Sequence, residues 1–401
     1  MALLHIPLDQ IDEARLQALI VAGAAESRMI DYKRTTYGNA HSDYSELLAD
    51  TSSFANTAGG DLILGMEAVN GIPTAVTPLV DPIDPEILRL AKLEQIVRGG
   101  LQPRIANVAF RAVPIQAGGA VLVIRIPRSF QAPHRVTRQG SNRFWARSAA
   151  GKYEPDVTEL RALFNAAPQL AQRVRDFRID RVAKVAAGAA PVPLMYAGAL
   201  IVHVVPFSAF DVSPGGLPLA EIQRDFRAFV PIGSSTAQGS RINFEGILKT
   251  SNADPQATQH RAYLQLYRNG IVETVDSSLV NTSTQIITFF DDKIIGATMR
   301  SLRDLAAVGV GPPYAVLASV IGVAGARLTF VRGAPGWSDD WSAPLDRDQY
   351  HFDEVILETI PADLAECAGL LRLMLDQAAN TGGRATSPIF DAQGRYIPPG
   401  S

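Results

Sequence analysis

The chain has 401 residues, of which 47% are hydrophobic and 19% charged, and its formal net charge is −3 at pH 7. This composition suits a globular protein of about two domains and excludes a chain that is disordered throughout. The single cysteine, Cys367, excludes a disulfide scaffold or a cysteine-rich zinc site and indicates a reducing compartment, so we expect a cytoplasmic protein.

Helical and strand patterns interleave over the first 167 residues. Helices are predicted over residues 11–23, from residue 42 to the glycines at 59–60, and over residues 85–98 and 155–164. Strands are predicted over residues 29–34, 61–67, 105–115, 120–126, 134–137 and 142–147. Because helices and strands alternate early and strands cluster late, we expect an α+β domain with a mixed sheet and flanking helices.

Residues 165–169 resemble a domain boundary. We therefore place one domain at residues 1–167, a second α+β domain at 168–379 and a loosely held, Gly- and Pro-rich tail at 380–401. The second domain contains a clear hairpin turn at Asn269-Gly270. We predict no catalytic centre in this half, and we interpret the run Arg241–Gly246 as a loop that enters a strand.

Later elements are predicted as a charged helix over residues 173–181, helices over 298–307 and 362–379, and strands over 196–205, 326–331 and 353–360. Two uncharged stretches, residues 185–210 and 305–326, are long enough to cross a bilayer. Prolines divide both stretches into pieces that are too short, so we expect no membrane span.

Positive charge is segregated within the first domain. Residues 1–167 hold 17 Lys and Arg against 17 Asp and Glu, yet residues 95–153 contain ten cations and no acid. Such segregation is typical of a surface for a polyanion, or of an exposed sheet whose cations pair with acids elsewhere in the fold. We predict that five of these cations contact nucleic-acid phosphates: Arg135, Arg138, Arg143, Arg147 and Lys152. The aromatic residues Phe144, Trp145 and Tyr153 are available to stack on bases.

A second group of residues combines carboxylates with a lysine. Asp31 and Lys33 are two apart on a predicted strand, so their side chains share a face. Glu26 precedes that strand and Glu67 ends the next predicted strand. Converging carboxylates bind Mg²⁺ or Mn²⁺, and a neighbouring lysine stabilises a phosphoryl transition state. The alternative interpretation is a surface ion pair between Asp31 and a nearby cation.

The stretch Ser52–Gly60 reads SSFANTAGG and is followed by a strand that begins DLILG. Two adjacent glycines allow the helix to end and the backbone to enter the strand tightly. Asn56 and Thr57 either satisfy the terminal carbonyls of the helix or reach a ligand. Nucleotide (ATP) phosphate binding near Gly59-Gly60 is a minor alternative, because no phosphate-binding lysine follows the glycines.

These segments together resemble the Schlafen AlbA_2 domain. The resemblance is carried by Glu26-Ser27 with Asp31-Tyr32-Lys33, then Phe54–Gly60, then Leu62–Glu67, and finally Phe144–Ser148. It covers roughly residues 10–165. Family members have Glu at the position of Asp31 and Asp at the position of Glu67, so this chain keeps both carboxylates but shifts each by one methylene.

The resemblance implies nucleic-acid binding, to RNA or DNA. Bacterial members of the family are described as DNA-binding proteins or regulators, so a bacterial DNA-binding regulator is the first expectation. In animal Schlafen proteins the domain is an endoribonuclease that acts on tRNA and rRNA with metal held by three acids. Carried over, those acids are Glu26, Asp31 and Glu67, with Asp61 as a weaker choice for the third. The alternative function is therefore a metal-dependent endoribonuclease acting in phage defence, with Lys33 facing the scissile phosphate and Mg²⁺ or Mn²⁺ as cofactor. The sequence leaves open whether the chain forms a homo-oligomer.

Overall fold

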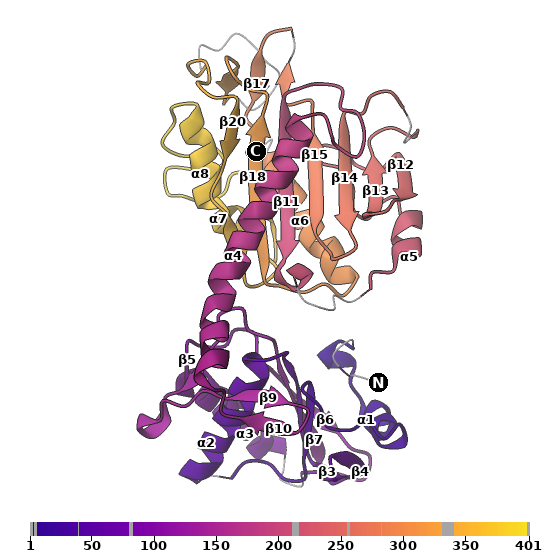
Figure 1. Cartoon of the computed structure of the whole chain (residues 1–401), viewed down its shortest axis with the longest axis vertical. Coiled ribbons are helices and arrows are strands. Elements are labelled where there is room, and N and C mark those ends of the chain that lie inside the picture. Colours follow the sequence, from indigo (N-terminus) through magenta and orange to yellow (C-terminus); the bar gives the residue numbers. More distant parts are fainter. Residues whose placement is uncertain are drawn as a thin grey trace. The chain divides into compact units, whose positions relative to one another are not determined.

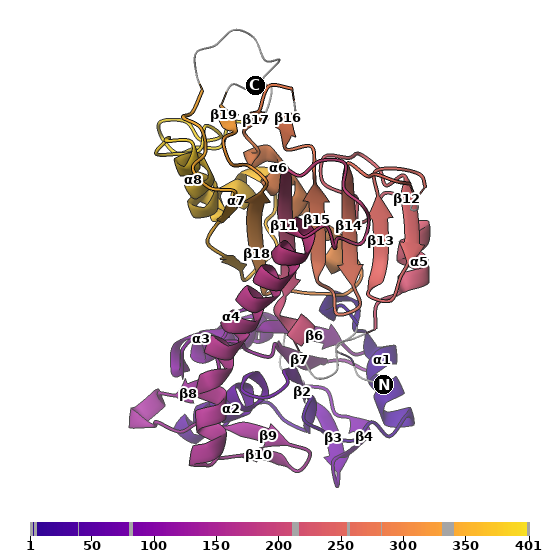
Figure 2. The ribbon, with the colours of Figure 1, turned by 45° about the horizontal axis from the view of Figure 1, so that its top comes forward.

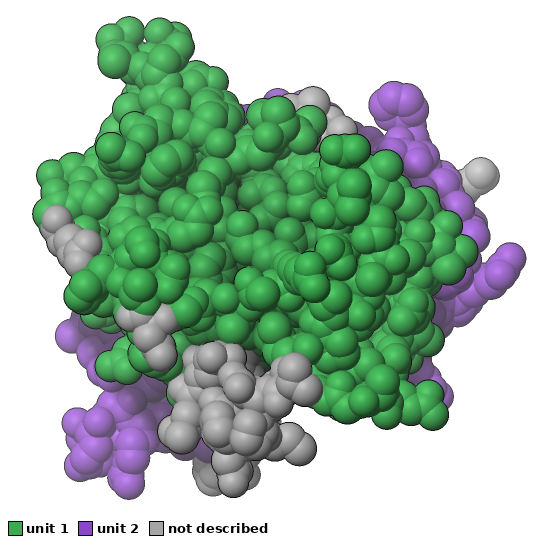
Figure 3. Space-filling model, turned by 90° about the horizontal axis from the view of Figure 1, so that it is seen from below, with its two compact units in different colours: residues 1–169 green, residues 170–401 purple. Residues whose placement is uncertain are grey.

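A computed structural model of the chain describes residue 3 and residues 6–38, 40–79, 83–210, 216–254, 257–281, 283–330 and 341–398. The chain divides into two compact units, residues 1–169 and 170–401, which Figure 3 colours separately. The division predicted from the sequence lies between residues 167 and 168.

The first unit contains helices and strands in mixed order. Its elements are η2 (Leu8–Gln10), α1 (Glu13–Val21), β1 (Ile30–Lys33), α2 (His41–Ala55), β2 (Gly60–Leu64), β3 (Met66–Val69), β4 (Ile72–Val76), α3 (Ile83–Gly100), β5 (Leu101–Gln102), β6 (Ala109–Pro114), β7 (Ala120–Ile126), β8 (Arg135–Val136), η3 (Arg138–Gly140), β9 (Ala146–Ser148), β10 (Gly151–Tyr153) and the start of α4 (Val157–Ala186).

A four-stranded sheet in the order β1-β2-β7-β6 organises this unit. β1 and β2 are parallel, whereas β7 is antiparallel to both of its neighbours. Alternate residues of β2 face opposite sides, as strand geometry requires. Leu62 and Leu64 pack with α2 and α3, while Ile63 packs with α1. The predicted α+β fold with a mixed sheet and flanking helices is confirmed.

The strand predicted over residues 61–67 is instead two strands in different sheets. Gly65 has φ +94°, a left-handed conformation that favours glycine and turns the chain out of β2. Glu67 therefore lies in β3, which pairs with β4 away from the four-stranded sheet. The pattern alone did not reveal this break, because the apolar run continues through it.

One continuous helix replaces the two helices and the boundary predicted over residues 155–181. The helix α4 contains Pro168 and runs from the first unit into the second. An interior proline removes one backbone hydrogen bond at a cost of about 3 kcal/mol. Packing of Val174, Val182 and Val185 against the second unit's sheet offsets that cost.

The second unit is also α+β. Its elements after α4 are β11 (Ala199–Pro206), η4 (Phe207–Phe210), α5 (Leu219–Arg224), β12 (Gly239–Ile242), β13 (Gly246–Thr250), β14 (Ala262–Tyr267), β15 (Val272–Asp276), β16 (Val280–Asn281), β17 (Ile286–Thr288), α6 (Asp291–Ala307), β18 (Tyr314–Ile321), β19 (Arg327–Thr329), β20 (Gln349–His351), β21 (Val355–Leu357), α7 (Leu364–Leu370) and α8 (Arg372–Thr381).

An eight-stranded sheet, in the order β12-β13-β14-β15-β11-β18-β20 with β21 also on β18, forms its centre. Helix α4 crosses one face, where Val182 and Val185 contact buried residues of the sheet (Figure 1 and Figure 2). Helices α6, α7 and α8 cover the other face around the largest apolar core. The predicted hairpin at Asn269-Gly270 joins β14 to β15.

The two uncharged stretches contain the central strands β11 and β18, which are buried along their whole length. Within the described residues no helix is long and apolar enough to cross a membrane. The segment after residue 380, predicted to be loosely held, instead packs on the second unit. Ile389 is fully buried and the Ser387 hydroxyl donates to Asp291 (2.8 Å), while residues 399–401 lie outside the described residues.

The run Arg241–Gly246 closes the turn between β12 and β13, so it does enter a strand as predicted. The Asn243 side chain accepts from the Gly246 N–H (2.8 Å) and donates to Gln265 (2.8 Å). A surface hollow of about 460 Å³ lies beside it, lined by Phe244, Glu245, Tyr267, Arg268 and Asn269. The absence of a catalytic centre in this half stays a prediction.

Candidate functional site

The strand β1 places Asp31 and Lys33 on one face of the four-stranded sheet. Ile30 and Tyr32 alternate with them and pack on the opposite face with α1. Asp31 is 8% exposed, so its charge is largely removed from water. A buried carboxylate needs compensating partners, and the structure supplies two.

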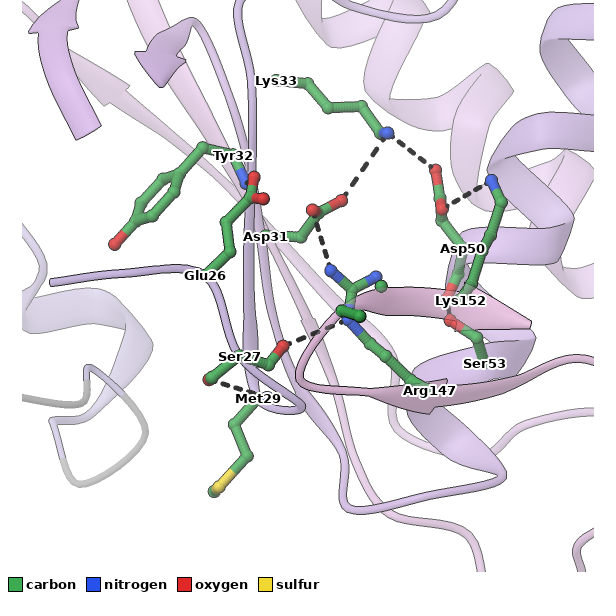
Figure 4. A network of polar contacts seen from close by, with 12 residues as sticks. Glu26, Ser27, Met29, Asp31, Tyr32, Lys33, Asp50, Ser53, Arg147 and Lys152 are labelled. Atoms are coloured by element: carbon green, nitrogen blue, oxygen red, sulfur yellow. Dashed lines mark hydrogen bonds and ion pairs between the residues drawn. The ribbon is translucent and has the colours of Figure 1, made fainter. Parts of the chain in front are cut away.

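Arg147 from β9 is the closer partner of Asp31. Its Nη2 lies 2.8 Å from Asp31 Oδ1, and Lys33 Nζ lies 3.6 Å from Oδ2 (Figure 4). The guanidinium also donates from Nε to the Ser27 carbonyl (3.2 Å) and lies 4.4 Å from the centre of the Phe54 ring. With 3% of its side chain exposed, Arg147 is bound inside the unit and does not lie on an open surface.

Asp50, from α2, extends the same network. Its carboxylate lies 3.2 Å from Lys33 Nζ and 2.9 Å from Lys152 Nζ, and it accepts from the Tyr37 hydroxyl (2.5 Å; Figure 4 shows the two lysines). Burial raises the pKa of Asp50, but Lys33 and Lys152 outweigh burial and hold it below its ordinary value. Lys152 also pairs with Glu46, so both of its partners are acids of α2.

Charge and burial also shift the neighbouring groups. Burial lowers the pKa of Lys33, but Asp50 and Asp31 more than reverse this, so the lysine stays protonated. Burial first, and then Asp50, raise the pKa of Tyr37 well above its usual value. The phenol therefore acts as a donor to Asp50 across the physiological pH range.

Glu26 lies next to Asp31. Its Oε1 accepts from the Tyr32 N–H (3.1 Å), and its own N–H donates to the Gly71 carbonyl (2.7 Å). Burial raises the pKa of Glu26, and the neighbouring Asp31 carboxylate raises it further. Two of the three predicted metal-binding acids are thus close together.

Among the described residues, no contact joins Glu67 to Glu26 or to Asp31. In β3 it pairs with Arg34, with Oε1 and Nη1 3.3 Å apart, and 36% of its side chain is exposed. In the part of the chain that the structure describes, no three His, Cys, Asp or Glu side chains are grouped to hold a metal ion. Asp61, the weaker choice, binds Arg125 through both carboxylate oxygens (2.8 and 2.9 Å). As arranged, the predicted acids do not fit a shared metal shell.

The remaining predicted cations lie in β8 and in the segment between β8 and β9. Arg135 donates to the amide oxygens of Asn142 (2.9 Å) and Gln102 (2.7 Å), and Arg138 lies 4.8 Å above the Tyr44 ring. Arg143 pairs with the exposed Glu154 at 3.1 Å. Short strands are present in both predicted segments, as β8 and β9, but β8 pairs with β5 and β9 with β10. Among the described residues, the two segments share one bridge, between Arg135 and Phe144.

The FANTAGG motif anchors this cation-bearing segment to α2. The Asn56 amide donates to the carbonyls of His134 (3.0 Å) and Trp145 (2.9 Å), and its oxygen accepts from the His134 N–H (2.7 Å). Thr57 Oγ1 accepts from the Arg147 N–H (3.0 Å). The two residues thus fix the backbone at both ends of the segment, at residues 134 and 145–147.

The glycines of the motif serve close packing. A Cβ on Gly59, whose φ is +71°, would lie 2.5 Å from the Arg128 backbone nitrogen. A Cβ on Gly60 would lie 2.5 Å from the Met29 carbonyl oxygen. Backbone already fills the space beside both residues, which accounts for the glycines without a phosphate ligand.

Sequence reasoning missed the acids of α2. Asp50 is 1% exposed and Glu46 lies one turn before it, and both bind Lys152. Asp43, Glu46 and Asp50 recur at intervals of three and four residues, which places them along one side of a helix. That periodic acidic pattern was the available signal, but the apolar face of the same helix dominated the interpretation.

Solved structures and curated sequences offer limited comparison. The DIP2311 protein from Corynebacterium diphtheriae is 18% identical, with a TM-score of 0.26, over 38% of this chain and 32% of its own length. The N-terminal domain of the "Putative ATP-dependent DNA Helicase RecG-related Protein" from Nitrosomonas europaea is 19% identical, with a TM-score of 0.27, over 37% of this chain and 95% of its own length. No curated protein matches the chain.

A family model of sequences, and not these structures, identifies the domain in the first unit. The model of the Schlafen AlbA_2 family matches residues 26–156. The matched range begins at Glu26, includes β1, the FANTAGG motif and β9, and ends just before α4. It coincides with the segments that carry the resemblance in the sequence. Residues 26–156 of this chain are therefore similar to the Schlafen AlbA_2 domain family, as the resemblance in the sequence predicts.

Proposed function

We propose that the first unit binds nucleic acid through backbone phosphates, with residues 135–143 as part of the contact surface. The match of residues 26–156 to the Schlafen AlbA_2 family model supports a nucleic-acid-related role. The proposal depends on one observation: some cations of residues 95–153 are paired with carboxylates of the fold, whereas others contact only neutral groups among the described residues.

Some of these cations are matched by internal carboxylates. Arg125 binds Asp61 and Arg147 binds Asp31, and both of these guanidinium groups are largely buried. Their charges stabilise the fold and contribute little to an external potential. Lys152, held by two acids of α2, belongs to the same class.

Arg135 and Arg138 differ from these residues. Among the described residues, both guanidinium groups contact neutral partners: the amides of Asn142 and Gln102 for Arg135, and the Tyr44 ring for Arg138. The Arg138 Nε is buried and has no hydrogen-bond partner in the described part of the chain, so any contact with phosphate would use the Nη groups. Uncompensated arginines with spare donors are the groups that hold phosphate oxygens.

Binding experiments with the full chain test this proposal. We would titrate fluorescent tRNA and duplex DNA and measure anisotropy from 50 to 200 mM salt. Affinity should fall with salt by a log–log slope of about 0.9 per phosphate neutralised on duplex DNA and about 0.7 on single strands. The double variant Arg135→Ala, Arg138→Ala should bind more weakly and lose about 1.4–1.8 from that slope.

The matched control removes two exposed arginines from the second unit. Arg347 and Arg395 have side chains 73% and 76% exposed, so their double alanine variant changes net charge equally. It should bind as wild type does. An unchanged slope in the Arg135, Arg138 variant would remove this segment from the interface. If the chain is a DNA-binding regulator, it should bind duplex DNA more tightly than tRNA, and its affinity should depend on the base sequence. The same titrations test that finer proposal.

A second candidate, metal-dependent RNA cleavage, is favoured by one observation: Glu26 and Asp31 are neighbouring carboxyl groups beside Lys33. A bound Mg²⁺ or Mn²⁺ would activate water and offset phosphate charge. In the described arrangement Asp31 is bound by two cations and Glu67 by Arg34, so we derive no step through a metal.

Incubation of tRNA with protein and Mn²⁺, or with chelator, tests this candidate directly. If the chain is a nuclease, Asp31→Asn should abolish cleavage while RNA affinity stays equal or rises slightly, because repulsion of phosphate falls. Calorimetric titration with Mn²⁺ alone gives a readout that needs no turnover. Absence of both cleavage and Mn²⁺ binding in the wild type would leave only the binding proposal.

A further inference from the structure

The first unit exposes an aromatic side chain that its core does not use. Phe164 in α4 is 56% exposed and contacts Phe144 edge to face, with ring centres 5.7 Å apart at 75°. Leu160 and Leu163, on the inward side of the same helix, are partly buried. The exposed face of Phe164, beside a second ring, is open to a planar ligand.

Cations lie directly beside this aromatic pair. Phe144 forms an antiparallel bridge with Arg135, and directly opposed residues in such a bridge project to the same side. Arg143, the next residue along the chain, has 64% of its side chain exposed. An open ring pair with Arg135 on the same side and Arg143 adjacent in the chain resembles the surfaces that hold unpaired nucleotides, in which the rings stack on bases and the cations follow the phosphates.

We infer that Phe164 and Phe144 form a stacking platform for unpaired bases, so that the first unit selects single-stranded nucleic acid. This inference rests on the proposed function and narrows its substrate class. In a duplex each base already stacks on its neighbours, so the ring faces are closed to a protein side chain. An unpaired strand offers both the base face and the phosphates that this surface complements.

One acidic side chain reduces the affinity that we expect of this platform for a nucleic-acid strand. Glu154 pairs with Arg143 at 3.1 Å, and both side chains are more than half exposed. This carboxylate therefore competes with phosphate for Arg143 and repels the strand. Replacing it by the neutral Gln frees the arginine, so Glu154→Gln should bind a single strand more tightly. A gain of affinity cannot arise from partial unfolding.

The experiment compares a fluorescent 12-nucleotide polyuridine strand with a 12-base-pair duplex at one fixed salt concentration, using the full chain. Phe164→Ala should weaken single-strand binding about 5- to 150-fold, the range for loss of one base stack, and leave duplex binding unchanged. Phe164→Trp should retain the affinity and show quenched tryptophan fluorescence when the strand binds. Val157→Ala is the matched control, because Val157 is an apolar residue of α4 that is 72% exposed and lacks a ring.

The outcomes separate the inference from the proposed function. If wild type binds the duplex but not the single strand, or if Phe164→Ala binds the strand as wild type does, the platform is refuted while nucleic-acid binding stands. If wild type binds neither, the proposed function itself fails. If Phe164→Ala turns a dimer into a monomer without changing strand affinity, the ring serves a second copy of the chain and the inference is overturned.

Discussion

Replacing Asp50 by Asn should destabilise the first unit selectively. The carboxylate is 1% exposed and is the shared partner of Lys33, Lys152 and the Tyr37 hydroxyl. Asn keeps the size and one acceptor oxygen but leaves two lysines without their central anion. Removing one partner of a buried ion pair costs about 3–5 kcal/mol. Since 29% of the Lys33 side chain and 18% of the Lys152 side chain are exposed, water screens part of that cost and we expect about 2–4 kcal/mol.

Hydrogen exchange measured against urea gives the readout, because peptides report each unit separately. Peptides from α2 should lose protection at lower urea in Asp50→Asn, whereas peptides from β11 in the second unit should be unchanged. Glu46→Gln is the control: Glu46 contacts the same Lys152 but its side chain is 51% exposed, so its loss should cost under about 1 kcal/mol.

The pH dependence provides an independent check. The pKa of Asp50 in the folded chain lies below its ordinary value of 3.8, so the folded state binds this proton less readily than the unfolded state does. The stabilisation from Asp50 is therefore fully present above about pH 4 and is lost as pH falls through the lowered pKa. Asp50→Asn should remove that part of the acid sensitivity. Equal α2 protection in wild type and Asp50→Asn at pH 7 would refute the view that this network holds β1, α2 and β10 together.

Two further predictions concern packing and the second unit. Gly59→Ala should cost about 2–4 kcal/mol in first-unit stability, since φ is +71° and the new Cβ would meet the Arg128 backbone at 2.5 Å; α2 exchange against urea measures this. Glu273→Gln should destabilise the second unit by about 3–5 kcal/mol, because the fully buried Glu273 binds Arg181 through both oxygens at 2.9 Å. Burial raises the pKa of Glu273, but Arg181 and His203 outweigh burial and lower it to about 2. The contribution of Glu273 to stability is therefore present above about pH 4.5 and is lost as pH falls toward 2. Hydrogen exchange of β11 peptides in acid measures this loss. Wild-type protection in either variant would contradict the corresponding argument.

The sequence predicts elements well where local chemistry decides them. The Asn269-Gly270 turn follows from glycine's access to positive φ, and it is confirmed. Local patterns fail where one residue redirects the chain. Gly65 interrupts an apolar run without any change in hydrophobicity, and this moves Glu67 to another sheet.

Only the part of the candidate site that lies on β1 could be predicted from the sequence. Asp31 and Lys33 share a face because successive side chains of a strand point to opposite sides, so their spacing of two residues is enough to predict it. Their partners Arg147 and Asp50 lie 116 and 19 residues later than Asp31 in the chain, on elements whose approach depends on the whole fold. Ion pairs of such separation follow from tertiary packing, so residue spacing could not identify them.

Counting charges by segment also misjudges what a surface offers. Residues 95–153 carry ten cations and no acid, which predicts a broad polyanion surface. Three of those cations, Arg125, Arg147 and Lys152, neutralise acids contributed by β1, β2 and α2. Because a compensated charge produces little field beyond its partner, the cations left with neutral partners attract a phosphate most strongly. Whether an arginine can contact phosphate therefore depends on whether the fold places a carboxylate beside it. For this reason Arg135 and Arg138, rather than Arg147, should govern the salt dependence of binding.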